Sequence, residues 1–282
     1  MEQLLIYEAL LVGVAIAALL CAAGVIRWER RRGHSREHAM LLSGWEGAVG
    51  YASGTVAFLL GLMLFFSVTH FTEAQGLASK EATAYATAFD ATRLLSPPAA
   101  GPLQRDLACM MQTTRDGSWE SMGRHDLTGD ENLTAWFVRL HADLAALDPM
   151  THGDVATATT AVMDLSQTRQ ARLLTAQSDL PAAIWVIIYL SVFVLFLLLG
   201  ITLFGNPLLM TVALGATIIL TGASIAALVF FADPYSDLGV TLEPTAIRAV
   251  IVRLQESNPG AIWDACPTLA APMDMSSLTL TP

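Results

Sequence analysis

The sequence predicts an all-α membrane protein with four transmembrane helices and an extracytoplasmic helical-bundle domain between the second and third of them. First, 54% of the 282 residues are hydrophobic and only 14% are charged, against about 25% charged residues in an average soluble domain. Second, four apolar runs reach the length of about 20 helical residues that a bilayer core requires. Third, the net charge of -10 excludes nucleic acid as a favoured partner, because phosphate binding needs an excess of Lys and Arg.

The predicted spans occupy residues 1–26, 47–70, 181–204 and 208–232. The first contains a single charge after its start, Glu8, which we interpret as an ordinary interfacial acid. Only Gly205, Asn206 and Pro207 separate the last two spans. Because these are turn residues, residues 181–232 are predicted to form a tight helical hairpin.

The orientation of the spans is predicted from the basic stretch "RWERRRGHSREH", which begins at Arg27 in the loop of residues 27–46. Lys and Arg in short loops stay on the cytoplasmic side of a membrane. We therefore expect a multi-pass protein of the inner cell membrane whose N-terminus, loop domain (residues 71–180) and C-terminal tail (residues 233–282) are extracytoplasmic. A secondary contact of the arginines with anionic lipid headgroups is the alternative role.

The loop domain is predicted to be helical because it is rich in Ala and shows apolar residues at helical spacing. "TEAQGLASKEATAYATAFDATRLL" continues the second span outward, and "SPPAAGP" is expected to break that helix. Asp154 is expected to cap the last helix of the domain. The remaining predictions are a short helix at residues 103–114, a loop at residues 115–132 and an amphipathic helix at residues 133–147.

Two cysteines, Cys109 in the loop domain and Cys266 in the tail, are both expected on the exported side. Disulfides persist in oxidising compartments outside the cytoplasm. We predict a Cys109–Cys266 disulfide that ties the tail to the loop domain, with two separate buried thiols as the alternative.

Small residues in the spans indicate where helices approach closely in lipid. In the second span Gly47, Gly54 and Gly61 recur every seven residues, and Gly50 and Gly54 form a GxxxG pair. These four glycines are predicted to support helix packing.

A hydroxyl stripe runs along the fourth span, formed by Thr217, Thr221 and Ser224. Two readings are open: packing between helices, with each hydroxyl bonded to nearby backbone, or a polar pore lining and ion path. No charged residue lies deep inside any span, which disfavours a proton relay.

Catalytic and metal-binding patterns are not found in the sequence. The histidines accompany no nucleophile motif, no glycine-rich phosphate loop occurs, and no Cys or His spacing is typical of a metal site. We therefore expect neither an enzyme nor a bound cofactor or metal.

The stretches "RQARLLTAQSDLPAAIW" (169–185) and "ADPYSDLGVTLEPTAI" (232–247) resemble bacterial membrane proteins that carry the bestrophin-like domain of unknown function. The resemblance extends over about residues 4 to 250 and differs at Tyr235, where the family often has Phe. It implies a membrane fold in which the following residues are structural: Glu81, Pro181, Trp185, Asp233, Pro234 and Gly239. The family name implies relatedness to anion channels, although the family has no settled activity.

Arg169 and Arg172 lie three residues apart and therefore on one helical face. They are expected either to form structural ion pairs with Glu81 or Glu73 or to make a cationic ring at an oligomeric pore mouth.

The function predicted from the sequence is that of a homo-oligomer in the lipid bilayer, which forms a channel-like pore for small ions, anions in particular. The alternative is a non-conducting membrane module whose extracytoplasmic helical domain binds a partner or senses an envelope condition. A hydrated axial path would favour the first, and a dry, closely packed bundle the second.

Overall fold

The computed structural model divides the chain into two compact units, which are described separately. The span unit comprises Met1–Phe71 and Asp179–Asp233, and the helical domain comprises Thr72–Ser178 and Pro234–Pro282. The structure describes residues 2–31, 38–123, 128–148, 154–176, 182–203, 207–232, 234–235, 242–264 and 266–267. Within these ranges the chain is helical and forms no strand, as predicted.

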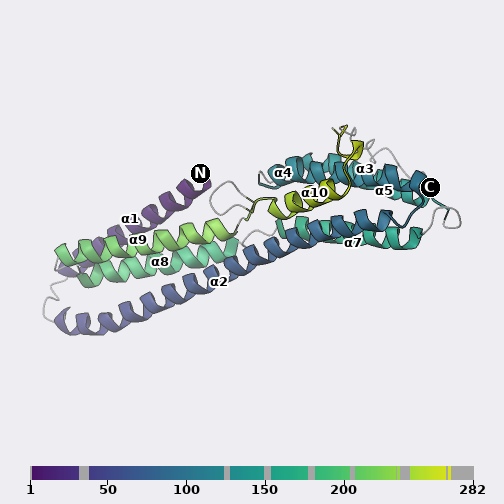
Figure 1. The fold of residues 1–282 in the computed structure, drawn as a ribbon. Coiled ribbons are helices and arrows are strands. Elements are labelled where there is room, and N and C mark those ends of the chain that lie inside the picture. Colours follow the sequence, from purple (N-terminus) through teal and green to yellow (C-terminus); the bar gives the residue numbers. More distant parts are fainter. Residues whose placement is uncertain are drawn as a thin grey trace, which may run out of the picture. The chain divides into compact units, whose positions relative to one another are not determined.

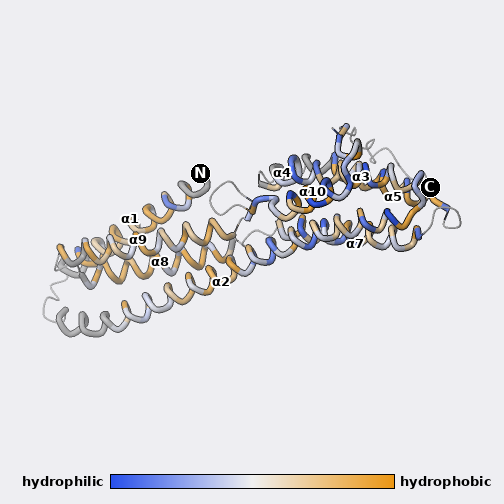
Figure 2. The backbone as a smooth tube through the Cα atoms, in the orientation of Figure 1, coloured by the Kyte–Doolittle hydropathy of each residue, from blue (hydrophilic) through white to orange (hydrophobic). Residues whose placement is uncertain are grey.

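The span unit contains α1 (Glu2–Arg31), α8 (Ala182–Leu203), α9 (Pro207–Ala232) and the first part of α2 (His38–Thr92). Helices α1, α8 and α9 lie side by side (Figure 1). Hydrophobic residues follow α8 and α9 along their whole length (Figure 2). Four helices are long and apolar enough to cross a membrane, which confirms the predicted number of spans: Ile6–Arg27, Gly47–Thr92, Ala183–Thr202 and Thr211–Ala232.

The core of the span unit is formed by apolar side chains of α1, α8 and α9, together with Val56 and Leu60 of α2. Leu11 and Ala18 of α1 pack with Val192 and Phe196 of α8, and all four are fully buried. Lipid tails are as apolar as these residues, so close van der Waals fit rather than hydrophobic transfer stabilises such a bundle.

Helix α2 is continuous over 55 residues, a length of about 80 Å at 1.5 Å per residue. This is far more than a bilayer core of about 30 Å requires. The prediction that the second span continues as one long helix is therefore confirmed, and the helix ends at Thr92. No proline interrupts it, so nothing breaks the ladder of backbone hydrogen bonds before that point.

The helical domain is built around the last part of α2. Fully buried Tyr85 and Phe89 of α2 contact Leu107, Trp136 and Leu140 in one apolar core. Burying each such side chain contributes about 1.5–3 kcal/mol. The other elements are α3 (Pro97–Thr113), η1 (Thr114–Ser118), α4 (Trp119–Gly123), α5 (Thr128–Ala145), α7 (Val155–Ala176), α10 (Thr245–Ser257) and η2 (Ala261–Trp263).

The proline-rich segment "SPPAAGP" ends α2 as predicted, but it is also the start of α3 rather than a linker. Prolines occupy the first two positions of α3, where the backbone has no intrahelical acceptor to lose. The predicted cap of the last loop-domain helix is confirmed, because Asp154 accepts a hydrogen bond of 3.0 Å from the Thr157 backbone N–H.

The predicted loop at residues 115–132 is wrong wherever the structure describes it. A π-helix, η1, continues α3 without a break, α4 follows at once, and α5 already begins at Thr128. Ser118, Ser121 and Met122 are buried here. Tertiary packing therefore overrides the low helix propensity of the Gly, Asp and Ser residues.

The tail contains a helix that the sequence analysis missed. Ile247, Ile251 and Leu254 of α10 lie at helical spacing and are buried in the core of the helical domain. This spacing of four and three residues was the available signal. Beyond α10, Trp263 stacks on Phe89 with ring centroids 6.0 Å apart.

Candidate functional site

A buried ion pair joins Arg172 of α7 to Glu81 of α2, and a cluster of side chains in the helical domain surrounds it. Both side chains are fully buried, and their contact combines an Nε–Oε2 ion pair with a 3.3 Å hydrogen bond from Nη2 to Oε1. Nη2 also lies 3.4 Å from the Ser118 hydroxyl, and Nη1 lies 3.2 Å from the Met122 sulfur. The guanidinium covers the Trp119 ring at 4.8 Å from its centroid. Arg172 is thus surrounded by partners from three elements.

The π-helix η1 supplies polar groups to this cluster. Its first residue, Thr114, shares a buried hydrogen bond of 2.9 Å with the Tyr85 hydroxyl of α2. Its last residue, Ser118, faces Arg172. A π-turn widens the helix by one residue and so re-aims the side chains that follow it, which is why such turns recur at functional sites.

Tyr235 packs against the same cluster, edge-on to Trp119 with ring centroids 5.6 Å apart. Its side chain is buried, and its hydroxyl has no hydrogen-bond partner among the described residues. Burial raises the pKa of Tyr235 to about 12, so the hydroxyl stays protonated. The adjacent Pro234 carbonyl accepts a 2.8 Å hydrogen bond from the Leu242 N–H.

Arg169 is buried one turn away from Arg172 but has different partners. It donates a 3.2 Å hydrogen bond to the Thr134 hydroxyl, and its guanidinium lies 4.9 Å from the centroid of the Phe137 ring. Neither arginine is exposed on the surface of the single chain. This burial favours structural ion pairs over a cationic ring, because a ring at a pore mouth needs guanidinium groups that reach the solvent.

The hydroxyl stripe of α9 is satisfied largely within its own helix. Thr217 donates to the Ala213 carbonyl and Ser224 to the Leu220 carbonyl, each at 2.8 Å. Thr221 is buried. Such back-bonding to residue i-4 removes the need for water or an ion, so the geometry favours the packing interpretation of this stripe.

Next to that stripe, the Glu8 carboxylate of α1 lies against the backbone of α9. A Cβ atom added at Gly222 would be 3.2 Å from Glu8 Oε2. Sequence reasoning interpreted Glu8 as an interfacial acid and missed this contact. The signal was the acid itself, because a carboxylate within an apolar helix usually has a specific neighbour.

The four glycines of α2 do not pack against any other helix in the described part of the chain. A Cβ atom added at Gly47, Gly50, Gly54 or Gly61 would meet nothing within 4 Å. The close approach occurs instead at Gly200 of α8, where an added Cβ would lie 2.9 Å from the Ala22 Cβ.

Among the residues singled out by the family resemblance, Trp185 connects α8 to α1. Its ring stacks on Tyr7 with centroids 4.5 Å apart, and the Tyr189 hydroxyl donates to the Tyr7 carbonyl at 3.3 Å. Glu81 belongs to the buried cluster, and Pro234 precedes Tyr235 beside it. Pro181, Asp233 and Gly239 lie outside the described residues.

The predicted disulfide is confirmed. Cys109 of α3 is bonded to Cys266, which lies 157 residues further along the chain, with a Cα–Cα distance of 5.4 Å. The bond fastens the segment after η2 to the core of the helical domain. Within the ranges that the structure describes, no three His, Cys, Asp or Glu side chains are grouped so that they would hold a metal ion.

Comparison with known proteins agrees with this architecture. The chain is similar to a variant of a bacterial bestrophin homologue from Klebsiella pneumoniae, with 14% identity, a TM-score of 0.61, and coverage of 90% of this chain and 98% of that one. A second structure of that homologue matches at 15% identity and a TM-score of 0.58, over 89% of this chain and 97% of that one. At this identity the similarity concerns the fold alone.

A third solved structure, described only as a membrane protein, matches at 14% identity and a TM-score of 0.61, over 87% of this chain and 97% of that one. No curated protein matches the sequence. The sequence model of the Bestrophin-like domain, however, matches residues 11–239, most of the chain. The chain therefore belongs to the Bestrophin-like domain family.

Proposed function

We propose that this protein is the subunit of a homo-oligomeric pore for small anions in the inner cell membrane, rather than an enzyme. The observation that carries the proposal is family membership across residues 11–239, together with a bestrophin-like fold over about nine-tenths of the chain. Four candidate spans supply the membrane part that such a pore needs.

The surface of α2 supports assembly between copies of the chain. Its glycines at positions 47, 50, 54 and 61 face open space in the single chain, and small residues allow helices to approach closely in lipid. Tyr51, Phe58 and Phe65 on the same helix are largely exposed. We place the subunit contacts and the ion path along this helix, in preference to the back-bonded hydroxyl stripe of α9.

The proposed orientation keeps the basic loop in the cytoplasm and the helical domain outside. The disulfide in the helical domain supports this orientation, because such bonds persist in oxidising compartments and are rare in the cytosol.

The test is ion flux through purified protein in sealed liposomes, with chloride and potassium gradients measured separately. We expect chloride flux that exceeds potassium flux, and a strong reduction in the Gly54→Leu variant. Gly13→Leu is the matched control, because a Cβ added at Gly13 of α1 also meets nothing within 4 Å. Equal reduction in both variants would contradict an ion path along α2.

Lack of flux from a folded, correctly oriented oligomer would overturn the pore. It would favour the alternative of a non-conducting module whose helical domain binds a ligand or partner. One observation already favours a binding role for that domain, namely the charged cavity between α3 and α5.

A further inference from the structure

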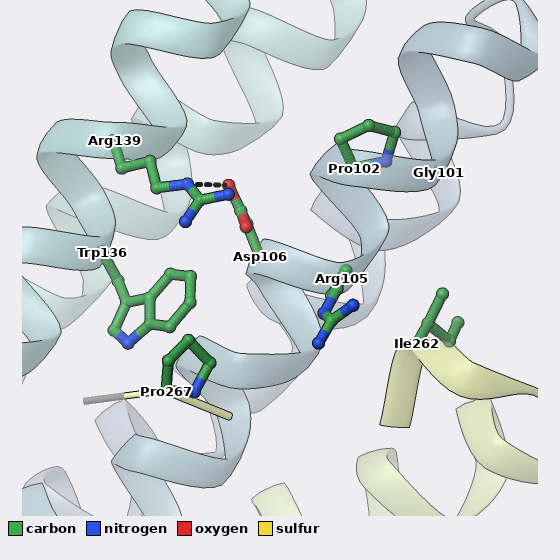
Figure 3. Close-up of a pocket in the computed structure, with 8 residues that line it drawn as sticks. All are labelled: Gly101, Pro102, Arg105, Asp106, Trp136, Arg139, Ile262 and Pro267. Carbon is green, nitrogen blue, oxygen red and sulfur yellow. Dashed lines mark ion pairs between the residues drawn. The ribbon is translucent and has the colours of Figure 1, made fainter. Parts of the chain in front are cut away.

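The helical domain contains a cavity of about 470 Å³ between α3, α5 and the segment around η2 (Figure 3). This volume lies within the range of about 300–1,000 Å³ that is typical of small-molecule sites. Part of its wall is apolar and comes from Pro102, Ile262 and Pro267. Pro267 follows Cys266 directly, so the disulfide holds this wall in place.

Two arginines and one aspartate line the same cavity: Arg105, Arg139 and Asp106. Figure 3 shows Arg139 and Asp106 pointing toward each other, and Arg139 Nε lies 3.2 Å from Asp106 Oδ2. The second ion pair of Arg139, to Asp143 at 3.7 Å, also uses Nε. Among the described residues Arg105 makes no ion pair, and Arg139 uses only its Nε for its two aspartate partners. The terminal nitrogens of both guanidinium groups therefore remain available as donors, while the two aspartates balance the two positive charges.

Trp136 adds an aromatic side chain to the cavity wall. The side chain is 1% exposed, and its indole Nε1 has no acceptor among the residues that the structure places. The Arg139 guanidinium lies 5.4 Å from the centroid of its ring. Because the Nε1 atom is itself buried from solvent, Trp136 contributes its ring to the cavity wall and not a donor that a ligand could reach.

We propose that this cavity binds a small organic carboxylate with a short apolar body. The forked guanidinium groups of Arg105 and Arg139 match the planar geometry of a carboxylate, while the prolines and Ile262 contact the apolar body. The proposal goes beyond conduction and does not depend on it, since every residue involved belongs to the helical domain.

The experiment is calorimetric titration of butyrate into the full-length protein in nanodiscs of neutral lipid, at constant ionic strength. Butyramide, which has the same shape without the charge, is titrated in parallel. We expect saturable binding of butyrate and none of butyramide. Inorganic phosphate is the third probe, and phosphate binding tighter than butyrate would overturn the carboxylate assignment.

Three variants connect binding to the cavity. Arg105→Gln is expected to weaken butyrate binding about tenfold, the usual effect of losing one charged hydrogen bond. Asp106→Asn removes the competing negative charge and is expected to strengthen binding severalfold. Arg93→Gln is the matched control, because Arg93 is an exposed arginine of the same domain paired with Asp90.

Binding that is unchanged in both cavity variants, or weakened equally by the control, would place butyrate elsewhere and overturn the proposal. Lack of saturable butyrate binding by the folded wild-type protein would also overturn it. Neither outcome affects the pore, because flux and binding are measured independently.

Discussion

Arg172 and Glu81 form a fully buried ion pair between two helices, although the residues are 91 positions apart in the chain. The pair fixes α7 against the end of α2, which is the same helix that contributes a candidate span. A buried pair of charges adds little net stability compared with apolar residues of the same size, but breaking one side of it is costly. A change of register between the two helices would leave one of the two charges buried without its partner.

Replacing Arg172 alone should strongly destabilise the helical domain. Arg172→Met leaves the Glu81 carboxylate buried without its cation, and we expect a loss of about 3–5 kcal/mol in the free energy of unfolding. The double variant Glu81→Met/Arg172→Met should recover most of that loss. Denaturant titration of detergent-solubilised protein measures both, with Arg93→Met at an exposed pair as the control. Equal unfolding midpoints for Arg172→Met and the control would contradict this role.

Removing the Tyr235 hydroxyl should stabilise the protein. The hydroxyl is buried without a partner among the described residues, and such a group costs about 1–3 kcal/mol. Tyr235→Phe should therefore raise the free energy of unfolding by about 1 kcal/mol. Tyr85→Phe is the matched control with the opposite sign, because it loses the bond to Thr114. A destabilised Tyr235→Phe protein would show that the hydroxyl has a partner in solution.

The stability of the helical domain should fall as the pH rises through about 6. Burial raises the pKa of Asp106 from 3.8 to about 6, and Arg139 only partly opposes this. A raised folded-state pKa means that the folded protein binds the proton more tightly than the unfolded chain does. The contribution of Asp106 to the free energy of unfolding is therefore complete below pH 4 and is lost as the pH rises. We expect the free energy of unfolding to fall by about 1–2 kcal/mol, a value kept small because solvent reaches Arg139.

Asp106→Asn should abolish this pH dependence and be more stable than the wild type at pH 8. Thermal unfolding followed from pH 4 to pH 8 measures the effect, and Asp90→Asn at an exposed carboxylate serves as the control. A wild-type profile that rises with pH over this interval would show that other groups outweigh Asp106.

Loss of the Cys109–Cys266 disulfide should loosen the tail. Replacing both cysteines with serine is expected to reduce the free energy of unfolding by about 2–5 kcal/mol. Because the bond anchors the chain just after η2, limited proteolysis should then cut between residues 242 and 267 first. An unfolding midpoint that is the same with and without reductant would contradict a structural role for the bond.

A methyl group should be tolerated at one glycine of the spans and not at another. Gly200→Ala would place its Cβ 2.9 Å from that of Ala22, so α1 and α8 must separate, at about 1–3 kcal/mol. Gly54→Ala meets nothing within 4 Å and should leave the monomer's thermal stability unchanged. Cross-linking in liposomes then shows whether Gly54→Ala alters assembly, as the proposed contact along α2 requires.

The local part of the fold was predictable from sequence, because its causes lie within short stretches of chain. Apolar length alone identifies the four spans, and the spacing of buried residues identifies α5. The Asp154 cap depends only on residues three positions apart. The disulfide was also predictable, because the predicted topology left just two cysteines on the same side of the membrane.

The sequence by itself therefore determined the class of the protein, its spans and its family, since hydrophobic length and family motifs require no knowledge of distant contacts. Only the tertiary structure decided that Arg172 pairs with Glu81 at full burial and that residues 115–123 are helical. It also brought Arg105, Trp136 and Arg139 to one cavity. Burial depends on which helices pack together, and Arg172 and Glu81 lie 91 residues apart in the chain.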